Sequence, residues 1–196
     1  TIILVTDFKN KLFPTIISRC QNIQLPALEK KVIEFMLEKK GVKQDKIKWI
    51  SCLSRGNFVS ASKIAGRDWK EIKKIFTFIS DFMLVNDHKK LIRFASDYSR
   101  LSMTDENEFR FHFLLIQRWL LGVLHIKKAI QDDLTESELN KGMNRFLSMY
   151  PQADIREINL LFESVVNGLN RNAHMSLLLT HFIIQLQKEL KPKSRS

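Results

Sequence analysis

The chain has 196 residues, 44% of them hydrophobic, and a formal net charge of +11. That length and composition supply a sizeable core for one or two domains, and they exclude collagen-like, low-complexity and wholly disordered chains. Six glycines and four prolines leave few turn-forming residues, which argues against a β-sandwich or barrel and favours a mainly α protein.

The first 25 residues combine two extended segments with a short helix. Ile2-Ile3-Leu4-Val5 predicts a buried strand, Pro14 suits the first turn of a helix, and residues 22–25 predict a second strand. Two strands are too few to form a sheet alone. We therefore expect residues 1–25 to be the trailing edge of an α/β domain, in a chain that starts at Thr1 as a fragment of a longer protein.

A small helical unit is predicted over residues 26–67. Pro26 marks the boundary, and the spacing of apolar residues predicts a first helix over 27–40. Asp45 is expected to cap a second helix, and a third is expected over 59–65.

Residues 68–190 predict a bundle of six longer helices, because apolar residues recur there every three or four positions. Ser102 and Thr104 offer caps for the third of these helices. Its middle is apolar on more than one face, so we expect it at the centre of the bundle or at an interface with another chain. A disordered tail is expected over 191–196. The six predicted helices span 69–85, 88–98, 105–130, 135–150, 155–170 and 175–190.

Neither the cysteines nor the histidines form a recognisable site in the sequence. Cys20 and Cys52 are too few for a disulfide scaffold, and no Cys/His group has the spacing of a zinc site. The five histidines include no pair at i, i+4, and we expect them to be structural or exposed. The apolar stretches 111–116 and 119–124 fall short of a bilayer span and no signal peptide is present, so we expect a cytoplasmic protein with no membrane partner.

The positive charge is concentrated in the first third of the chain. Residues 1–70 hold 14 Lys and Arg against 6 Asp and Glu, whereas residues 71–150 hold 12 against 11 and residues 151–196 hold 6 against 4. Contact with nucleic-acid phosphates and a set of lysines solvated on helix surfaces explain this charge equally well. No alternation of aromatic and basic residues typical of single-strand binding is visible. Both interpretations stay open.

A family resemblance appears in the segment Leu12-Phe13-Pro14-Thr15-Ile16-Ile17-Ser18-Arg19-Cys20-Gln21. Ser18-Arg19-Cys20 resembles the Ser-Arg-Cys motif of clamp loaders, the AAA+ ATPase assemblies that open ring-shaped sliding clamps and place them on primed DNA. Residues 2–7 resemble the sensor 1 strand that precedes this motif. The resemblance implies that 1–25 is the remnant of an AAA+ domain, 26–67 a three-helix lid and 68–190 the helical collar through which subunits associate.

The resemblance also implies roles for single residues. Arg19 would be an arginine finger reaching ATP and magnesium held by the neighbouring subunit, while the chain itself binds no cofactor; the simpler interpretation is a surface arginine at a helix end. A guanidinium suits the finger role because it can donate two hydrogen bonds to γ-phosphate oxygens. Thr6 would occupy the sensor 1 position, although a local hydrogen bond at a strand end explains it equally well. We expect Ser18 to satisfy a backbone group and Cys20 to be a small buried residue.

One departure from the family's pattern indicates the type of subunit. ATP-hydrolysing subunits carry a Gly-Ser-x-Arg-type segment whose arginine is sensor 2, but the matching stretch here is Gly56-Asn57-Phe58-Val59. Val59 cannot donate to phosphate, and Arg55 is more simply a charge at a helix C-terminus. A subunit that keeps Ser-Arg-Cys without sensor 2 resembles the delta-prime family of bacterial DNA polymerase III clamp loaders, which supply an arginine finger without hydrolysing ATP.

The partners implied by this resemblance are the ATPase and clamp-opening subunits, primed DNA in the assembled complex, and the sliding clamp through other subunits. The sequence has no glycine-rich phosphate loop and no Ser/His/Asp arrangement, so the chain alone is not expected to be catalytic. Two alternatives remain open. One is a stand-alone basic helical module that binds nucleic acid, and the other is a fragment of an ATP-hydrolysing clamp-loader subunit.

Overall fold

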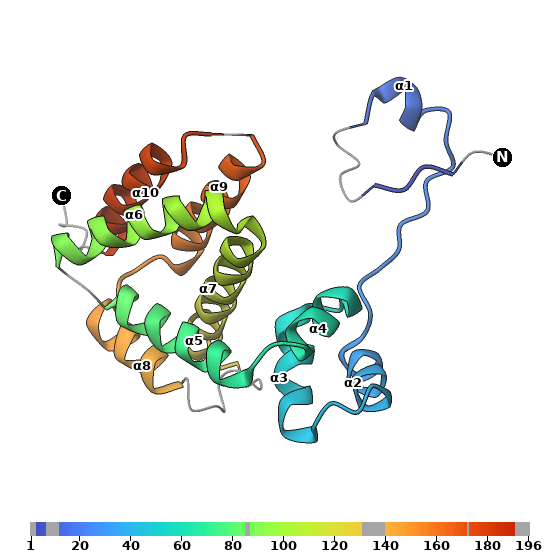
Figure 1. Ribbon diagram of the computed structural model, residues 1–196, viewed down its shortest axis with the longest axis horizontal. Helices are drawn as coiled ribbons and strands as arrows, with labels where there is room; N and C mark the ends of the chain where they lie inside the picture. The colour runs from blue at the N-terminus through green and yellow to red at the C-terminus, as the bar shows by residue number, and fades with distance from the viewer. Residues whose placement is uncertain (1–2, 7–11, 85–86, 131–139, 172, 191–196) are drawn as a thin grey trace.

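The computed structural model describes residues 3–6, 12–84, 87–130, 140–171 and 173–190. Over these ranges the protein is mainly helical, with ten helices and no strand, which confirms the predicted mainly α class (Figure 1). None of these helices combines the length and the apolar character that crossing a membrane requires. The helices are α1 (Pro14–Ile17), α2 (Lys30–Lys39), α3 (Gln44–Ser54), α4 (Phe58–Ala65), α5 (Trp69–Met83), α6 (His88–Thr104), α7 (Glu106–Lys127), α8 (Asn140–Met149), α9 (Ile155–Leu169) and α10 (Met175–Leu190).

Residues 12–29, which we call the arm, carry α1 and lead to the start of α2. Figure 1 shows α1 standing apart from the other helices, joined to them by an extended stretch of chain. The two predicted strands do not form in the described chain, because residues 3–5 and 22–25 have no backbone hydrogen-bond partner there. An extended segment becomes a strand only when a neighbouring strand completes the ladder. Ile2 and the predicted loop over 7–11 lie outside the described residues.

Helices α2, α3 and α4, which we call the three-helix unit, pack against one another. Asp45 is not the cap of α3, and that prediction is wrong: the helix begins one residue earlier, at Gln44, and its N-cap residue Lys43 makes no side-chain cap. Asp45 lies instead in the first turn, where a negative charge favours the positive end of the helix dipole. The buried apolar residues of the unit are Ile33, Leu37, Ile47, Ile50, Leu53, Ala61 and Ile64.

The turn between α3 and α4 ties the arm to the three-helix unit. Arg55, the C-cap residue of α3, has a left-handed backbone with φ 54°, and Gly56 follows with φ +75°. The amide of Leu28 donates to the carbonyl of Gly56 at 3.0 Å. A Cβ at position 56 would lie 2.4 Å from the carbonyl oxygen of Leu28, so this close approach of two backbones requires glycine.

Helices α5 to α10 form a bundle around α7. As predicted, α7 is central: it packs against α5, α6, α8 and α9, while α10 packs against α6 and α9. Residues on several faces of α7 are buried, which explains why its apolar pattern does not follow a single stripe. Its buried residues are Phe109, Phe111, Phe113, Leu115, Ile116, Arg118, Trp119, Leu120, Gly122 and Val123.

The start of α7 differs from the prediction. Its cap is Asp105, whose carboxylate accepts from the amide of Glu108 at 2.9 Å. Ser102 and Thr104 were expected as caps, but α6 continues through both of them, six residues beyond its predicted end at Tyr98. Their hydroxyls therefore donate to carbonyls of the preceding turn, as serine and threonine do inside a helix.

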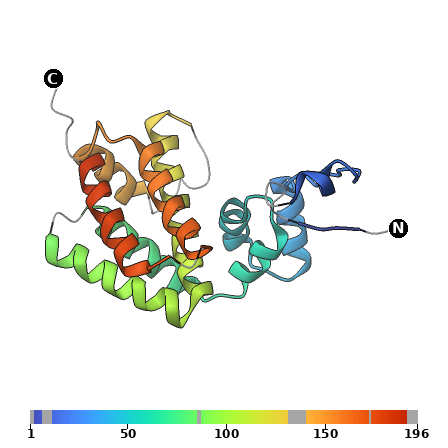
Figure 2. The ribbon, with the colours of Figure 1, turned by 90° about the horizontal axis from the view of Figure 1, so that it is seen from above.

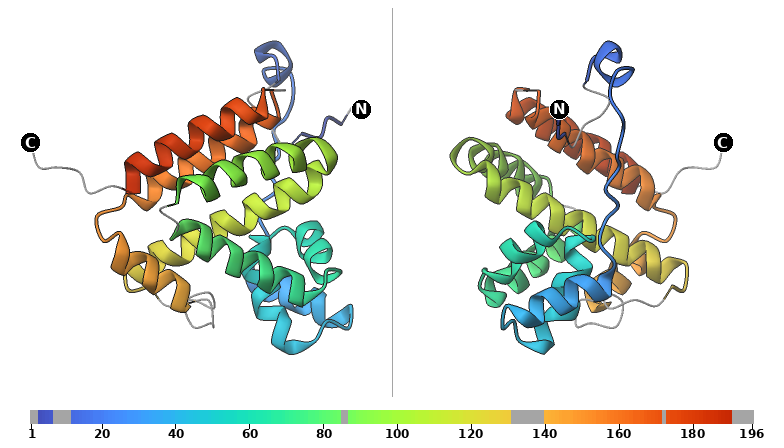
Figure 3. Two further views of the ribbon diagram at one scale, coloured as in Figure 1. Left: turned by 60° about the vertical axis from the view of Figure 1, so that its left-hand side comes forward. Right: turned by 90° about the vertical axis from the view of Figure 1, so that its right-hand side faces the viewer.

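The three-helix unit lies beside the bundle at the start of α5 (Figures 2 and 3). Trp49 of α3 packs edge-on against Trp69 at 5.6 Å and Phe76 at 6.3 Å between ring centroids. Arg67, just before α5, lies 3.9 Å from the ring centroid of Phe111. Two predicted segments lie outside the described residues: the start of the helix predicted over 135–150, up to residue 139, and the tail over 191–196.

Candidate functional site

Arg19 directly follows the single turn of α1. The amide of Arg19 donates to the carbonyl of Ile16 at 3.1 Å, which closes the end of the helix. Pro14 sets the first turn, where its missing amide hydrogen costs nothing. The Arg19 side chain is exposed, and its guanidinium forms no ion pair or hydrogen bond with the described chain. The arm therefore presents a planar cation to the solvent.

The predictions for the residues near Arg19 agree with the structure at Ser18 and disagree with it at Cys20. Ser18 Oγ donates to the carbonyl of Thr15 at 3.2 Å, which is the local role predicted for it. Cys20 is exposed, so the prediction of a buried apolar residue is wrong. The reason is that α1 buries no residue, so a side chain after it finds no core to pack against in the part of the chain that the structure describes. Thr6 is exposed in the short described segment 3–6 and is not hydrogen-bonded to Arg19.

Val59 lies in the first turn of α4 and is 65% exposed. The helix is capped by Asn57, whose side-chain oxygen accepts from the amide of Ser60 at 2.9 Å. The structure does not bring Val59 and Arg19 together, because α1 and α4 stand apart in all views (Figures 1 and 3). The two residues singled out by the family resemblance therefore belong to separate parts of the chain.

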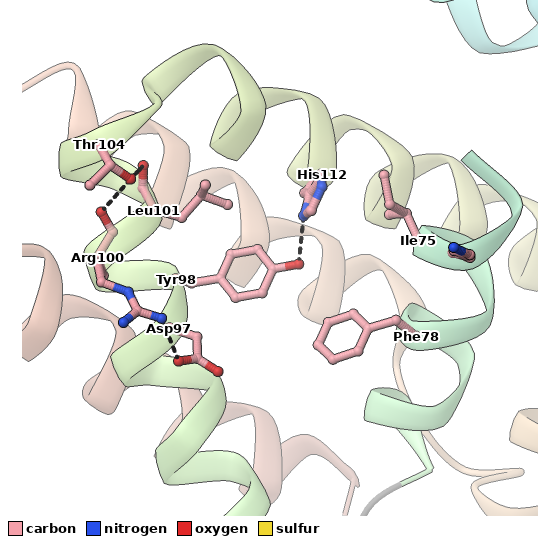
Figure 4. Close-up of a pocket in the computed structure, with 9 residues that line it drawn as sticks. Ile75, Phe78, Asp97, Tyr98, Arg100, Leu101, Thr104 and His112 are labelled. Atoms are coloured by element: carbon pink, nitrogen blue, oxygen red, sulfur yellow. Dashed lines mark hydrogen bonds and ion pairs between the residues drawn. The ribbon is translucent and has the colours of Figure 1, made fainter. Parts of the chain in front are cut away.

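A pocket of about 440 Å³ opens between α5, α6 and α7 (Figure 4). Its wall includes Phe78 of α5 and Leu101 of α6, and its polar residues include Lys74 and Arg100. In Figure 4 the ring of Tyr98 points across the pocket toward His112. The pocket thus combines an apolar lining with two polar side chains in contact with each other, Tyr98 and His112.

A chain of polar contacts runs from this pocket to the start of α5. The Tyr98 hydroxyl lies 2.9 Å from Nδ1 of His112, and Nε2 of His112 lies 3.2 Å from a carboxylate oxygen of Glu108. The other carboxylate oxygen of Glu108 pairs with Arg67 at 2.6 Å. Since a carboxylate only accepts, Nε2 of the neutral imidazole carries the proton and Nδ1 accepts from Tyr98. The chain therefore joins α6, α7 and the segment before α5.

Burial favours the neutral form of both His112 and Tyr98. It lowers the pKa of His112, an effect that Glu108 opposes and Arg67 reinforces. Burial, with the charge of Glu108, raises the pKa of Tyr98. The arrangement can position a ligand by hydrogen bonds, but the hydroxyl is already committed as a donor to His112. This network was not predicted from the sequence, although Glu108 and His112 stand four residues apart on a predicted helix, which places them on one face.

The His112 network gives an expected pH dependence of stability. Burial lowers the folded-state pKa of His112 from its unfolded value of about 6.5. As the pH falls, the imidazole of His112 therefore binds a proton in the unfolded chain at a higher pH than in the folded chain. The contribution is fully present above about pH 6.5 and is lost as the pH falls through the folded-state pKa. Between about pH 7 and 5, the unfolding free energy of a His112→Gln variant should therefore fall less steeply than that of the wild type.

One proton changes this slope by at most about 1.4 kcal/mol per pH unit. Urea titrations at a series of pH values measure the slope. Glutamine keeps a donor and an acceptor for Glu108 and Tyr98, and the other histidines contribute equally to both proteins. Equal slopes in the two proteins would contradict the assignment.

Comparisons with known proteins identify no relative: no family model, no curated protein and no solved structure matches this chain.

Proposed function

We propose that the protein is a non-hydrolysing clamp-loader subunit of the delta-prime type, acting in DNA replication in the cytoplasm. Arg19 would serve as an arginine finger for ATP and magnesium held by a neighbouring subunit. The observation that carries the proposal is the exposed Arg19 within Ser18-Arg19-Cys20, presented at the end of a proline-initiated turn with no partner in the described chain. A guanidinium left unpaired on an arm is available to a second molecule.

The order of the parts supports the same proposal. The arm, the three-helix unit and the bundle follow one another as the AAA+ remnant, lid and collar would in a clamp-loader subunit. Residues 1–25, 26–67 and 68–190 would be these three parts. Val59 occupies the position where an ATP-hydrolysing subunit would carry the sensor 2 arginine, and a valine offers no hydrogen bond to phosphate.

The bundle carries exposed apolar residues suited to contact with other subunits. Leu177 is 69% exposed and Ile184 is 48% exposed, and their spacing of seven residues places them on one face of α10. Leu160 of α9, the helix that packs against α10, is 53% exposed. We propose that this region contributes to association with the ATPase and clamp-opening subunits. Primed DNA would be a partner in the assembled complex, and the sliding clamp would be reached through the other subunits.

A second candidate function rests on the charge of the first 70 residues, 14 Lys and Arg against 6 Asp and Glu. Several of these cations are exposed, including Lys31, Lys39 and Lys43 in and around α2. A stand-alone nucleic-acid-binding module would use them to neutralise phosphates directly.

One experiment with two measurements separates the candidates. The chain is mixed with the clamp-loader ATPase subunits of its source and followed by size-exclusion chromatography with light scattering, and its binding to primed DNA is measured by fluorescence anisotropy. We expect a stable complex with the ATPase subunits and weak DNA binding by the chain alone. Tight DNA binding that falls by about a thousandfold or more between 50 and 200 mM salt, without a protein complex, would instead establish the nucleic-acid module.

A further inference from the structure

Arg118 is a buried cation in the middle of α7. The residue is only 3% exposed, and its side-chain Nε and Nη2 atoms are buried without a hydrogen-bond partner. No carboxylate of the described chain pairs with it. Burying a guanidinium in this way is costly unless an anion or a set of acceptors compensates it. Arg118 therefore lacks the group that normally accompanies a buried arginine.

Two groups of the neighbouring three-helix unit interact electrostatically with Arg118, and one of them, Arg55, makes this imbalance larger. They are Arg55 and Cys52, both at the C-terminal end of α3. Burial and the charge of Arg55 lower the pKa of Arg118 to about 10, and Cys52 opposes this effect. Even so, Arg118 is a cation at neutral pH, and two positive charges lie at the junction of the three-helix unit and the bundle.

The fold holds the two arginines in this arrangement. Trp49 packs against Trp69 and Phe76, which fixes the face of α3 that is turned toward the bundle. Cys52 stands one turn after Trp49 and so lies near that face, whereas Arg55 is the C-cap residue that ends α3 beside the bundle. Arg55 is exposed and has a left-handed backbone with φ 54°, a conformation that is uncommon for arginine and persists where the surrounding structure enforces it.

The carbonyl end of α3 offers only partial compensation for these charges. A helix C-terminus carries roughly half a negative charge, whereas the two guanidinium groups carry two positive ones. None of the carbonyls there accepts a hydrogen bond from Arg118. A compact anion with several acceptor oxygens would satisfy the planar donor edges of both side chains.

We propose that Arg118 and Arg55 bind a small phosphate-bearing anion at the junction of the three-helix unit and the bundle. Arg118 supplies the buried side of the site and Arg55 its exposed rim, and the anion connects α7 to the end of α3. The burial of Arg118 restricts the ligand to one phosphate group at this point, either free phosphate or the terminal phosphate of a nucleotide. This proposal does not depend on the role proposed for Arg19.

Thermal unfolding of the full chain tests the proposal. Sodium phosphate or ATP is titrated at an ionic strength matched with sodium chloride, for the wild type and for Arg118→Met, Arg55→Ala and Arg171→Ala. We expect phosphate to raise the midpoint of the wild type above the chloride value. The apparent affinity should fall at least tenfold in Arg118→Met and Arg55→Ala, because each loses charge-assisted hydrogen bonds. It should be unchanged in Arg171→Ala, which removes an exposed arginine elsewhere.

The two titrants distinguish the sources of the phosphate: ATP that binds more tightly than inorganic phosphate indicates a nucleotide, and equal or weaker binding indicates the free ion. Arg118→Met is expected to fold, since a buried charge without its partner is replaced by an apolar side chain of similar length. Equal effects of phosphate and chloride on the wild type, or a phosphate effect that survives in both arginine variants, would overturn the proposal.

Alkylation of the cysteines gives a second measurement that does not depend on unfolding. Cys52 lies at the proposed site, whereas Cys20 is exposed on the arm and serves as an internal control. Phosphate should slow the reaction of Cys52 with neutral iodoacetamide several-fold, as followed by mass spectrometry, and leave Cys20 unchanged. The same slowing in Arg118→Met would contradict the proposal.

Discussion

Replacing Arg19 with alanine is expected to lower ATP hydrolysis at the adjoining site of a reconstituted clamp loader by about a thousandfold or more. In its proposed role Arg19 stabilises the charge on the transferred phosphoryl group, which the methyl group of alanine cannot do. The assembly itself should still form, because Arg19 is exposed and its guanidinium forms no hydrogen bond or ion pair with the described chain. Single-turnover phosphate release measures hydrolysis at the affected site, and light scattering measures assembly.

Two further variants make this result specific. Arg19→Lys keeps the charge but cannot donate in a planar, two-pronged geometry, so it should recover only a small part of the rate. Arg171→Ala removes an exposed arginine at the end of α9 and should leave the rate unchanged. If every site of the Arg19→Ala assembly releases phosphate at the wild-type rate, Arg19 is not an arginine finger.

Replacing Phe113 with alanine should lower the unfolding free energy of the chain by about 3–5 kcal/mol. Phe113 is fully buried at 0% exposure and lies where three helices meet. Its ring centroid is 4.4 Å from that of Phe109, 5.8 Å from that of Tyr98 and 5.7 Å from that of Phe162. Alanine would remove these contacts and leave a cavity that the surrounding rings cannot fill without shifting. Chemical denaturation followed by circular dichroism measures the loss.

Phe35 provides a matched control for this experiment, because it is also a helical phenylalanine but is 55% exposed. Its ring contacts the ammonium group of Lys39 at 4.6 Å from the centroid. Phe35→Ala should therefore cost no more than about 1 kcal/mol. Equal losses of unfolding free energy in Phe113→Ala and Phe35→Ala would show that the packing of the Phe113 ring does not stabilise the bundle.

The helices could be predicted from the sequence because their apolar residues repeat with the period of a helix. The prediction for 175–190 coincides with α10, and that for 155–170 ends one residue beyond α9. Helix ends were harder to place: Asp105 rather than Ser102 or Thr104 caps α7. All three residue types make good caps, so the sequence alone does not decide which one the chain uses.

The features that the sequence did not predict depend on which residues meet in space. The strands predicted at 2–5 and 22–25 needed partners that the described chain does not place beside them. Cys20 was expected to be buried, but exposure depends on what covers a residue rather than on its type. The electrostatic interaction of Arg55 with Arg118 joins positions 63 residues apart, and the sequence alone does not show that α3 packs against the bundle.

The sparse contacts of the arm have a consequence for how this sequence can change. No residue between 12 and 29 is buried, and α1 contributes nothing to the core. Most substitutions that are lost from proteins are lost because they push stability below the level that folding requires. In the arm that filter is almost absent, so Ser18, Arg19 and Cys20 are free to vary as far as the folding of the described chain is concerned. If the tripeptide is maintained among relatives of this protein, packing within the described chain is not the reason.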